Sequence, residues 1–130
     1  MKVGLTKKGG IGMYRKVNLK DIVFDIIYKR MTIDVEGWQS VEKLVRGMFI
    51  TRFTSDEMDV TMIVNRDMNI LRFLFRWELE KRGRDVKVHI EGNEYVFRRC
   101  RVYDINIDDL REDAMSLTVS FKHSGILVER

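Results

Sequence analysis

The 130-residue sequence contains no proline, two histidines and a single cysteine. With Cys100 as its only thiol, the chain forms no internal disulfide, so its fold must depend on a hydrophobic core. No apolar run approaches the roughly 20 residues of a membrane-spanning helix, and no membrane partner is expected. The N-terminal residues MKVGLTKKGGIGMYRK lack the apolar core of a signal peptide, which predicts no export by that route.

Signatures of catalysis and of cofactor binding are also missing. His89 and His123 have no partner at zinc or catalytic spacing, and Cys100 stands in no local nucleophile motif. No glycine-rich phosphate loop follows an expected strand. The sequence therefore predicts a protein that is not an enzyme and has no cofactor and no metal site.

What charge there is lies unevenly along the chain. The formal net charge is +4. Residues 1–30 carry eight lysines and arginines against two aspartates, so the remaining hundred residues sum to −2. A nearly neutral body argues against phosphate binding outside the N-terminal segment.

The N-terminal segment divides into two parts. Residues 1–17 contain four glycines and scattered lysines without an apolar period, and we expect a flexible basic arm. Residues 18–27 place apolar side chains at helical spacing, although their β-branched content also permits a strand. These apolar residues are Leu19, Ile22, Val23, Ile26 and Ile27.

The remainder alternates apolar and polar residues in a way that predicts strands. The strands are expected over residues 31–38, 47–53, 58–64, 86–90, 94–103 and 116–122. A helix is expected over residues 67–82, with Gly83 as its C-cap and Glu78 paired with Arg82. This order of elements predicts a mainly β (α+β) domain over residues 18–130, which follows the N-terminal arm. We expect the domain to be an antiparallel sandwich or barrel of about six strands with one flanking helix.

The stretch VFRRCRVYDINIDDLREDAMSLTVSF, residues 96–121, begins with three arginines in four positions, continues with five carboxylates in ten and permits three interpretations. Strand alternation would place Arg99 and Arg101 on one face with Tyr95 and Phe97, a weak signal for nucleic acid. The acidic part, expected as a loop, lacks the alternating oxygen ligands and turn glycine of a calcium site. The third interpretation pairs the two charge signs across neighbouring copies, while strand edges supply the affinity. The interface candidates are Arg99, Arg101, Asp104, Asp108, Asp109, Glu112 and Asp113.

Four segments resemble the tail-tube proteins of contractile-tailed phages and the related tube protein of type VI secretion. They are MTIDVEGWQSVEKLVRG, MDVTMIVNRDMNILRFLFRWELEKRGRDVKVHI, YVFRRCRVYDINIDD and SLTVSFKHSGI, which together cover about a hundred residues. The resemblance implies a six-stranded barrel or sandwich flanked by a helix. It also implies hexameric rings that stack into a hollow conduit for DNA.

On this resemblance we expect a virion structural protein of a phage tail, assembled in the host cytoplasm. Its partners would be other copies of itself, tail sheath or baseplate proteins, and DNA in transient passage without sequence-specific binding. The family has a long extension between its second and third strands, whereas here only Thr54–Glu57 separate them. The chain could therefore be a baseplate tube initiator or a tail-completion protein, or its N-terminal segment could replace the extension, with arm contacts from Lys7, Lys8, Arg15 and Lys16. The alternative function is a small nucleic-acid-binding β-barrel with a basic tail.

Overall fold

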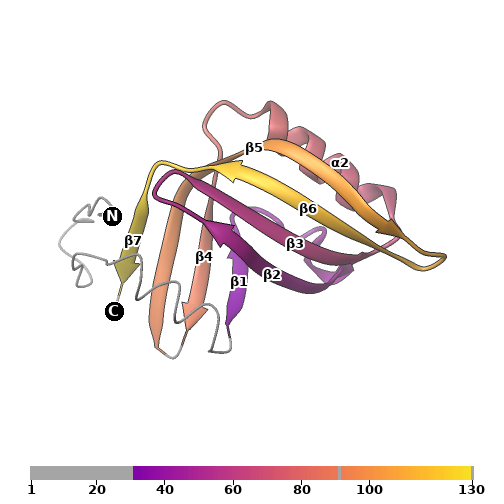
Figure 1. Cartoon of the computed structure of the whole chain (residues 1–130), viewed down its shortest axis with the longest axis horizontal. Helices are drawn as coiled ribbons and strands as arrows, with labels where there is room; N and C mark the ends of the chain where they lie inside the picture. Colours follow the sequence, from indigo (N-terminus) through magenta and orange to yellow (C-terminus); the bar gives the residue numbers. More distant parts are fainter. Residues whose placement is uncertain (1–30, 91, 130) are drawn as a thin grey trace.

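The computed structural model describes residues 31–90 and 92–129. The predicted arm over residues 1–17, its four contact residues and the helix or strand expected over residues 18–27 lie outside the described residues. Within the described part the chain forms seven strands, one α-helix and one short 3-10 helix (Figure 1). The predicted mainly β, antiparallel fold with one flanking helix is confirmed.

The elements follow one another with short connections. In chain order they are β1 Thr32–Val35, η1 Glu42–Leu44, β2 Val45–Phe53, β3 Glu57–Asn65, α2 Met68–Leu79, β4 Arg84–Ile90, β5 Asn93–Leu110, β6 Ala114–Lys122 and β7 Ile126–Glu129. Six of the strands overlap the six that the alternation predicts, and β7 is an additional one. The three residues Thr54, Ser55 and Asp56 link β2 to β3. The Thr54 N–H closes this turn by donating to the Glu57 carbonyl oxygen at 2.8 Å.

All strand pairs are antiparallel, in the order β1-β4-β5-β6-β3-β2, and β7 also pairs with β5. The 18-residue strand β5 belongs to two groups of strands: its first part pairs with β4 and β7, and its second part pairs with β6. Figure 1 shows β5 bending between the two groups, which enclose the core. Because β1 and β2 end the order without pairing to each other, the described sheet is open, as in a sandwich, and does not close into a barrel.

Strand alternation divides β3 and β6 cleanly between core and solvent. Their inward side chains are buried to between 0% and 4% exposure and comprise Met58, Val60, Met62, Val64, Met115, Leu117, Val119 and Phe121. The residues between them on the outward face are mostly short and polar. This pattern is why the alternation in the sequence predicts both strands correctly.

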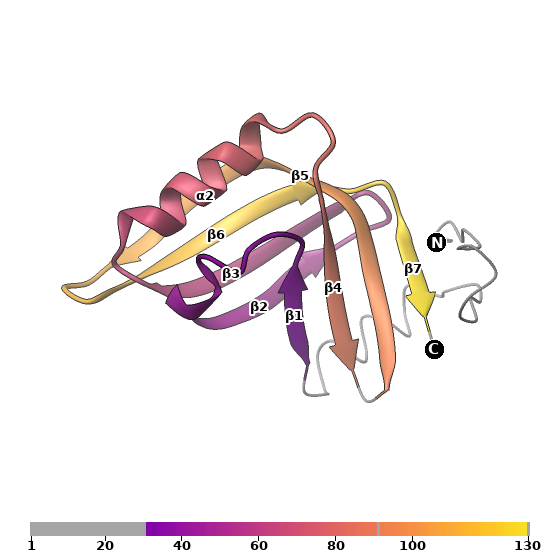
Figure 2. The same ribbon diagram turned by 180° about the vertical axis from the view of Figure 1, so that it is seen from behind.

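Helix α2 covers the core side of β5 (Figure 2). Asp67 begins it, because its carboxylate accepts a hydrogen bond from the Asn69 N–H at 2.8 Å, as an N-cap does. Ile70, Leu74 and Trp77 are its buried residues. The apolar period therefore places the helix correctly.

The predicted end of the helix is wrong. The helix stops at Leu79, since Glu80 is extended with ψ 133°, and the predicted end at Arg82 is three residues too late. Gly83 is thus not its C-cap. Arg82 does not pair with Glu78 along a helix, and its guanidinium instead contacts the Glu36 carboxylate at 2.7 Å.

Candidate subunit interface

The four-stranded group β2-β3-β6-β5 has two free edges. Strand β2 ends the sheet, and no described strand pairs with its outer side. On β5, pairing with β4 stops at Cys100 and pairing with β7 covers only residues 94–97, so one side of residues 101–110 is unpaired within the described chain. Free edges present backbone N–H and C=O groups that can pair with a second chain.

The outward face of this group is polar and weakly acidic. The register aligns Phe49, Thr61, Thr118 and Asn106 in one row across the four strands. Thr61 and Thr118 are bonded at 3.4 Å, and the Thr118 hydroxyl also donates to the Asp108 carboxylate. The charged residues of this face are three cations and five carboxylates: Arg52, Arg101, Lys122, Glu57, Asp59, Asp104, Asp108 and Asp109. Such a face would repel a polyanion slightly and would not bind it.

A bulge in β5 separates its two pairing regions. Opposite β4, Val86 pairs with Phe97 and Arg84 pairs with Cys100, so β5 carries one more residue than β4 over this interval. Arg99 has a φ of 51°, the only positive φ of a non-glycine residue in the described chain. The extra residue shifts the alternation of side chains and bends the strand, as bulges do.

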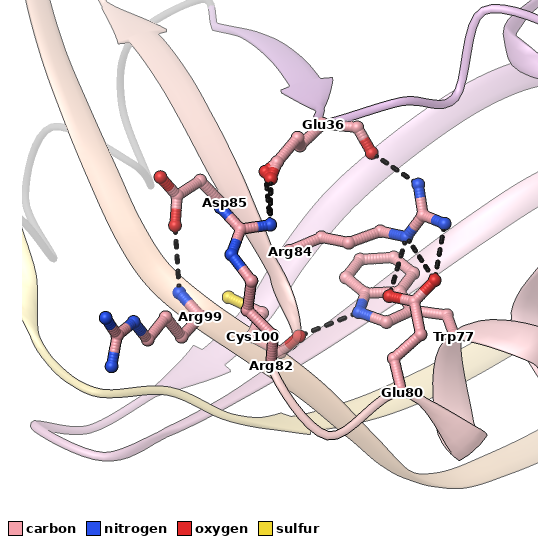
Figure 3. Close-up of polar contacts among 8 residues, drawn as sticks. All are labelled: Glu36, Trp77, Glu80, Arg82, Arg84, Asp85, Arg99 and Cys100. Atoms are coloured by element: carbon pink, nitrogen blue, oxygen red, sulfur yellow. Dashed lines mark hydrogen bonds and ion pairs between the residues drawn. The ribbon is translucent and has the colours of Figure 1, made fainter.

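Three contacts hold the bulge in place. Two of them are hydrogen bonds drawn in Figure 3: the indole N–H of Trp77 donates to the Cys100 carbonyl oxygen at 2.7 Å, and the Arg99 N–H donates to the Asp85 carboxylate at 3.0 Å. Gly83 lies so close that a Cβ there would stand 2.6 Å from the Cys100 carbonyl oxygen. The end of α2 and the start of β4 thereby fix where β5 leaves one group of strands for the other.

A polar network ties β1 to the same place (Figure 3). The Arg84 guanidinium contacts the Glu80 carboxylate through Nε at 3.0 Å and donates to the Glu36 carbonyl oxygen at 2.7 Å. It also lies 4.7 Å from the centre of the Phe73 ring. The cleft beside the network, about 430 Å³, is lined by Glu36, Glu80, Lys81, Arg82, Gly83 and Arg84. Four of these charged groups already pair within the chain, Arg82 with Glu36 and Arg84 with Glu80. These contacts make the region a structural clamp.

The predicted arginine face is wrong. Tyr95 and Phe97 are buried, with 3% and 0% of their surface exposed, whereas Arg99 and Arg101 are exposed. The bulge is the reason, because it puts Cys100 and not Arg99 on the side of Phe97. Because the aromatic rings are buried, they cannot stack on bases beside these arginines. The residues of this strand therefore no longer support an interpretation as a nucleic-acid-binding surface.

The predicted acidic loop is wrong as well, because β5 continues through it to Leu110. Asp104, Asp108 and Asp109 therefore lie on the free-edged part of β5, and only Glu112 and Asp113 lie in the turn before β6. Asp109 pairs with Arg111 at 2.9 Å. The five carboxylates form a row along the strand and its turn, which places them beside the edge where a second chain would pair.

The sequence pattern does not indicate that β2 is a free edge, or that Arg46 connects β2 to the turn between β5 and β6. Arg46 on β2 donates to the Asn65 side chain at 2.6 Å and contacts the Asp113 carboxylate at 3.5 Å. It thereby links the start of β2 to the β5–β6 turn. Phe49, half exposed on the last strand of the sheet, is the signal in the sequence that could have indicated a contact surface there.

The remaining chemical groups of the described chain are used for structure. Residues 31–90 and 92–129 contain no group of three or more His, Cys, Asp or Glu side chains that could hold a metal ion. Burial raises the pKa of the Cys100 thiol and lowers the pKa of His123 below 6.5. His123 accepts from the Gly125 N–H at 3.1 Å and bonds the Thr54 carbonyl oxygen at 3.0 Å. No helix in the described part is long and apolar enough to cross a membrane.

Comparison with known proteins assigns no family. No protein-family model, curated protein or solved structure matches the chain.

Proposed function

We propose that this protein is a non-enzymatic structural subunit of a tube of the phage-tail type, whose copies join side by side into closed rings. The observation that supports it best is the four-stranded group with a free edge at β2 and another along residues 101–110 of β5. Because the four strands alternate in direction, β5 of one copy would meet β2 of the next in an antiparallel arrangement. A contact between two different surfaces of the same chain repeats from copy to copy and closes into a ring when its rotation allows.

The outward face suits the lining of such a ring. Its carboxylates outnumber its cations, and threonine, serine and asparagine side chains fill the rows between them. Each phosphate that a wall neutralises adds salt-sensitive affinity, so a wall of this composition lets DNA pass without binding it. Six copies per ring, a location in the virion tail, assembly in the host cytoplasm and contacts with sheath or baseplate proteins belong to the same proposal, on the strength of the sequence resemblance.

The charged residues at the edge have a secondary part in the proposal. Arg101, Asp104 and Asp108 flank the free side of β5, and Arg99 and Glu112 mark its two ends. An exposed ion pair contributes only about 0–1 kcal/mol. Backbone pairing along some nine residues therefore supplies the affinity, and the charges select the alignment of the two strands.

The test is the assembly state of the full chain. Negative-stain images and sedimentation should show rings of uniform bore, and proline on β2 should abolish them, because proline lacks the N–H that an edge donates. Phe49→Pro and Ile50→Pro are made separately. Adjacent residues direct their N–H groups to opposite sides of the strand. One of the two variants therefore removes an N–H group from the free edge while it keeps the β2–β3 pairing intact.

The matched control is Thr32→Pro at the start of β1, an edge strand of the other group, which should assemble normally. Circular dichroism confirms that each variant is folded. A wild-type chain that sediments as a monomer at every concentration and salt would overturn the proposal.

A further inference from the structure

An apolar cleft opens between the start of α2 and the end of the β5–β6 hairpin. Figures 1 and 2 show the first turn of α2 and the hairpin tip at the same end of the molecule. The cleft has a volume of about 280 Å³ and is lined by Arg66, Asp67, Met68, Leu71, Ile107, Leu110 and Met115. We call it the hairpin cleft.

The mouth of the hairpin cleft is apolar and uncovered in the described chain. Met68, Ile107 and Leu110 are 59%, 54% and 53% exposed. The two polar lining residues are occupied elsewhere: Asp67 caps α2 at 2.8 Å, and Arg66 donates to the Arg111 carbonyl oxygen at 3.3 Å. A cluster of exposed apolar side chains marks a contact with another protein segment. Its volume is below the roughly 300–1,000 Å³ typical of small-molecule pockets.

The chain itself contains a segment of matching chemistry. Thirty residues precede Met31 and lie outside the described part, and residues 18–27 among them carry an apolar stripe at helical spacing. Amphipathic helices bind clefts of this kind through side chains at such i, i+3, i+4 and i+7 positions. Residues 18–27 have a net charge of −1, unlike the basic residues before them, so their apolar stripe and not their charge matches the cleft.

The length of chain between residues 18–27 and β1 indicates which copy supplies the segment. Thr32 pairs with His89, which pairs with Glu94 near the start of β5, whereas the hairpin cleft lies at the other end of that strand. Beyond the bulge alone, Arg101–Leu110 extends for about 33 Å. The five residues from Ile27 to Thr32 span at most about 18 Å when fully extended. This separation along the sheet favours docking in the cleft of a neighbouring copy over docking in the same chain.

We propose that residues 18–27 of one copy dock in the hairpin cleft of another copy. This inference rests on the proposed function, because it assigns the contact to neighbouring rings in a stack. It also supplies the contact that the short Thr54–Glu57 connection cannot make. Lateral ring closure uses the strand edges, and stacking uses this apolar contact.

The first experiment is disulfide trapping in the full chain. Two differently tagged forms are co-expressed, one with Val23→Cys and the other with Leu110→Cys, and assemblies are oxidised; buried Cys100 stays unreacted. Docking raises the effective concentration of the two thiols, so the mixed disulfide should exceed the control by about tenfold. The control replaces Leu110→Cys with Leu79→Cys, which is exposed and outside the cleft.

A second experiment separates stacking from ring formation. Ile22→Asp with Ile26→Asp, and separately Leu110→Asp, should leave single rings and abolish stacked tubes in electron micrographs. Phe24→Asp, off the apolar stripe, and Leu79→Asp are the matched controls and should still stack.

The possible outcomes are distinct. A wild-type chain that forms no rings would contradict the proposed function. Rings that stack equally well in the aspartate variants, or a Val23→Cys, Leu110→Cys chain that forms its disulfide internally, would overturn this inference and leave the proposed function standing.

Discussion

The indole N–H of Trp77 donates to the backbone carbonyl oxygen of Cys100 at 2.7 Å, and both residues have no exposed surface. This contact joins the last turn of α2 to β5 at the residue after its bulge. It is the only side-chain donor that the described structure gives to that carbonyl. The direction in which β5 leaves the bulge, and with it the position of the free edge, therefore depends in part on this buried side chain.

Replacing Trp77 with phenylalanine removes this donor and part of the buried ring. The carbonyl oxygen of Cys100 then loses its side-chain donor in the core, and a buried group left short of a hydrogen bond costs about 1–3 kcal/mol. We expect the free energy of unfolding, measured with urea, to fall by about that amount. The control is Phe75→Leu on the exposed side of the same helix, which should change it by about 0.5 kcal/mol or less. Equal effects of the two substitutions would contradict the assigned role of the indole N–H.

Two glycines with positive φ allow strain and crowding to be measured separately. Gly83 and Gly92 have φ values of 79° and 83°. A Cβ at Gly92 would meet no atom within 4 Å, whereas at Gly83 it would lie 2.6 Å from the Cys100 carbonyl oxygen. Gly92→Ala should therefore cost only the backbone strain, roughly 1 kcal/mol. Gly83→Ala should cost about 1–3 kcal/mol more, because the backbone must move. Denaturant titrations of both variants test this, and equal losses would show that β5 does not approach Gly83 closely.

Much of the fold could be predicted from the sequence because burial follows strand and helix periods. The alternation in β3 and β6 survives unchanged in the structure, and α2 forms where the apolar period predicts a helix. Its buried residues are Ile70, Leu74 and Trp77. Met68, Phe75 and Leu79 are exposed, so the period locates the helix but not its buried face. The bulge at Arg99 could not be predicted, because nothing in the local sequence marks the extra residue. The contacts that hold it come from Trp77 and Asp85, which are 22 and 14 positions away in the chain.

That extra residue explains the error about the arginine face. Beyond the bulge the alternation is shifted, so the aromatic residues before it and the arginines after it no longer share a face. The extension of β5 to Leu110 was missed because charged residues usually indicate a loop. Here β6 pairs with them on one side, and their charges lie at a sheet edge exposed to solvent.

The Arg84 clamp should require the shape of the guanidinium and not only its charge. Arg84 bonds the Glu80 carboxylate and the Glu36 carbonyl oxygen and also lies over the Phe73 ring, and its side chain is only 21% exposed. Lysine cannot make all of these contacts at once. We expect Arg84→Lys to lower the free energy of unfolding by about 1–2 kcal/mol.

The matched control for this clamp is Arg82→Lys. Arg82 pairs with Glu36 at the surface, with 69% of its side chain exposed. Thermal denaturation should show an unchanged midpoint for this variant. Equal losses in both variants would show that the effect does not come from the contacts that only Arg84 makes, and would contradict the clamp.

His123 should make stability depend on pH below neutrality. Burial lowers its pKa below 6.5 in the folded chain, so above about pH 6.5 the imidazole is neutral in both states and costs nothing. As the pH falls below 6.5, the unfolded chain takes up a proton that the folded chain resists, and stability falls by at most about 1.4 kcal/mol per pH unit. Protonation would also turn Nδ1 into a donor facing the Gly125 N–H. Urea titrations between pH 5.5 and 7.5 should show this slope in the wild type and in His89→Gln, and its loss in His123→Gln. A slope that persists in His123→Gln would assign the dependence to another group.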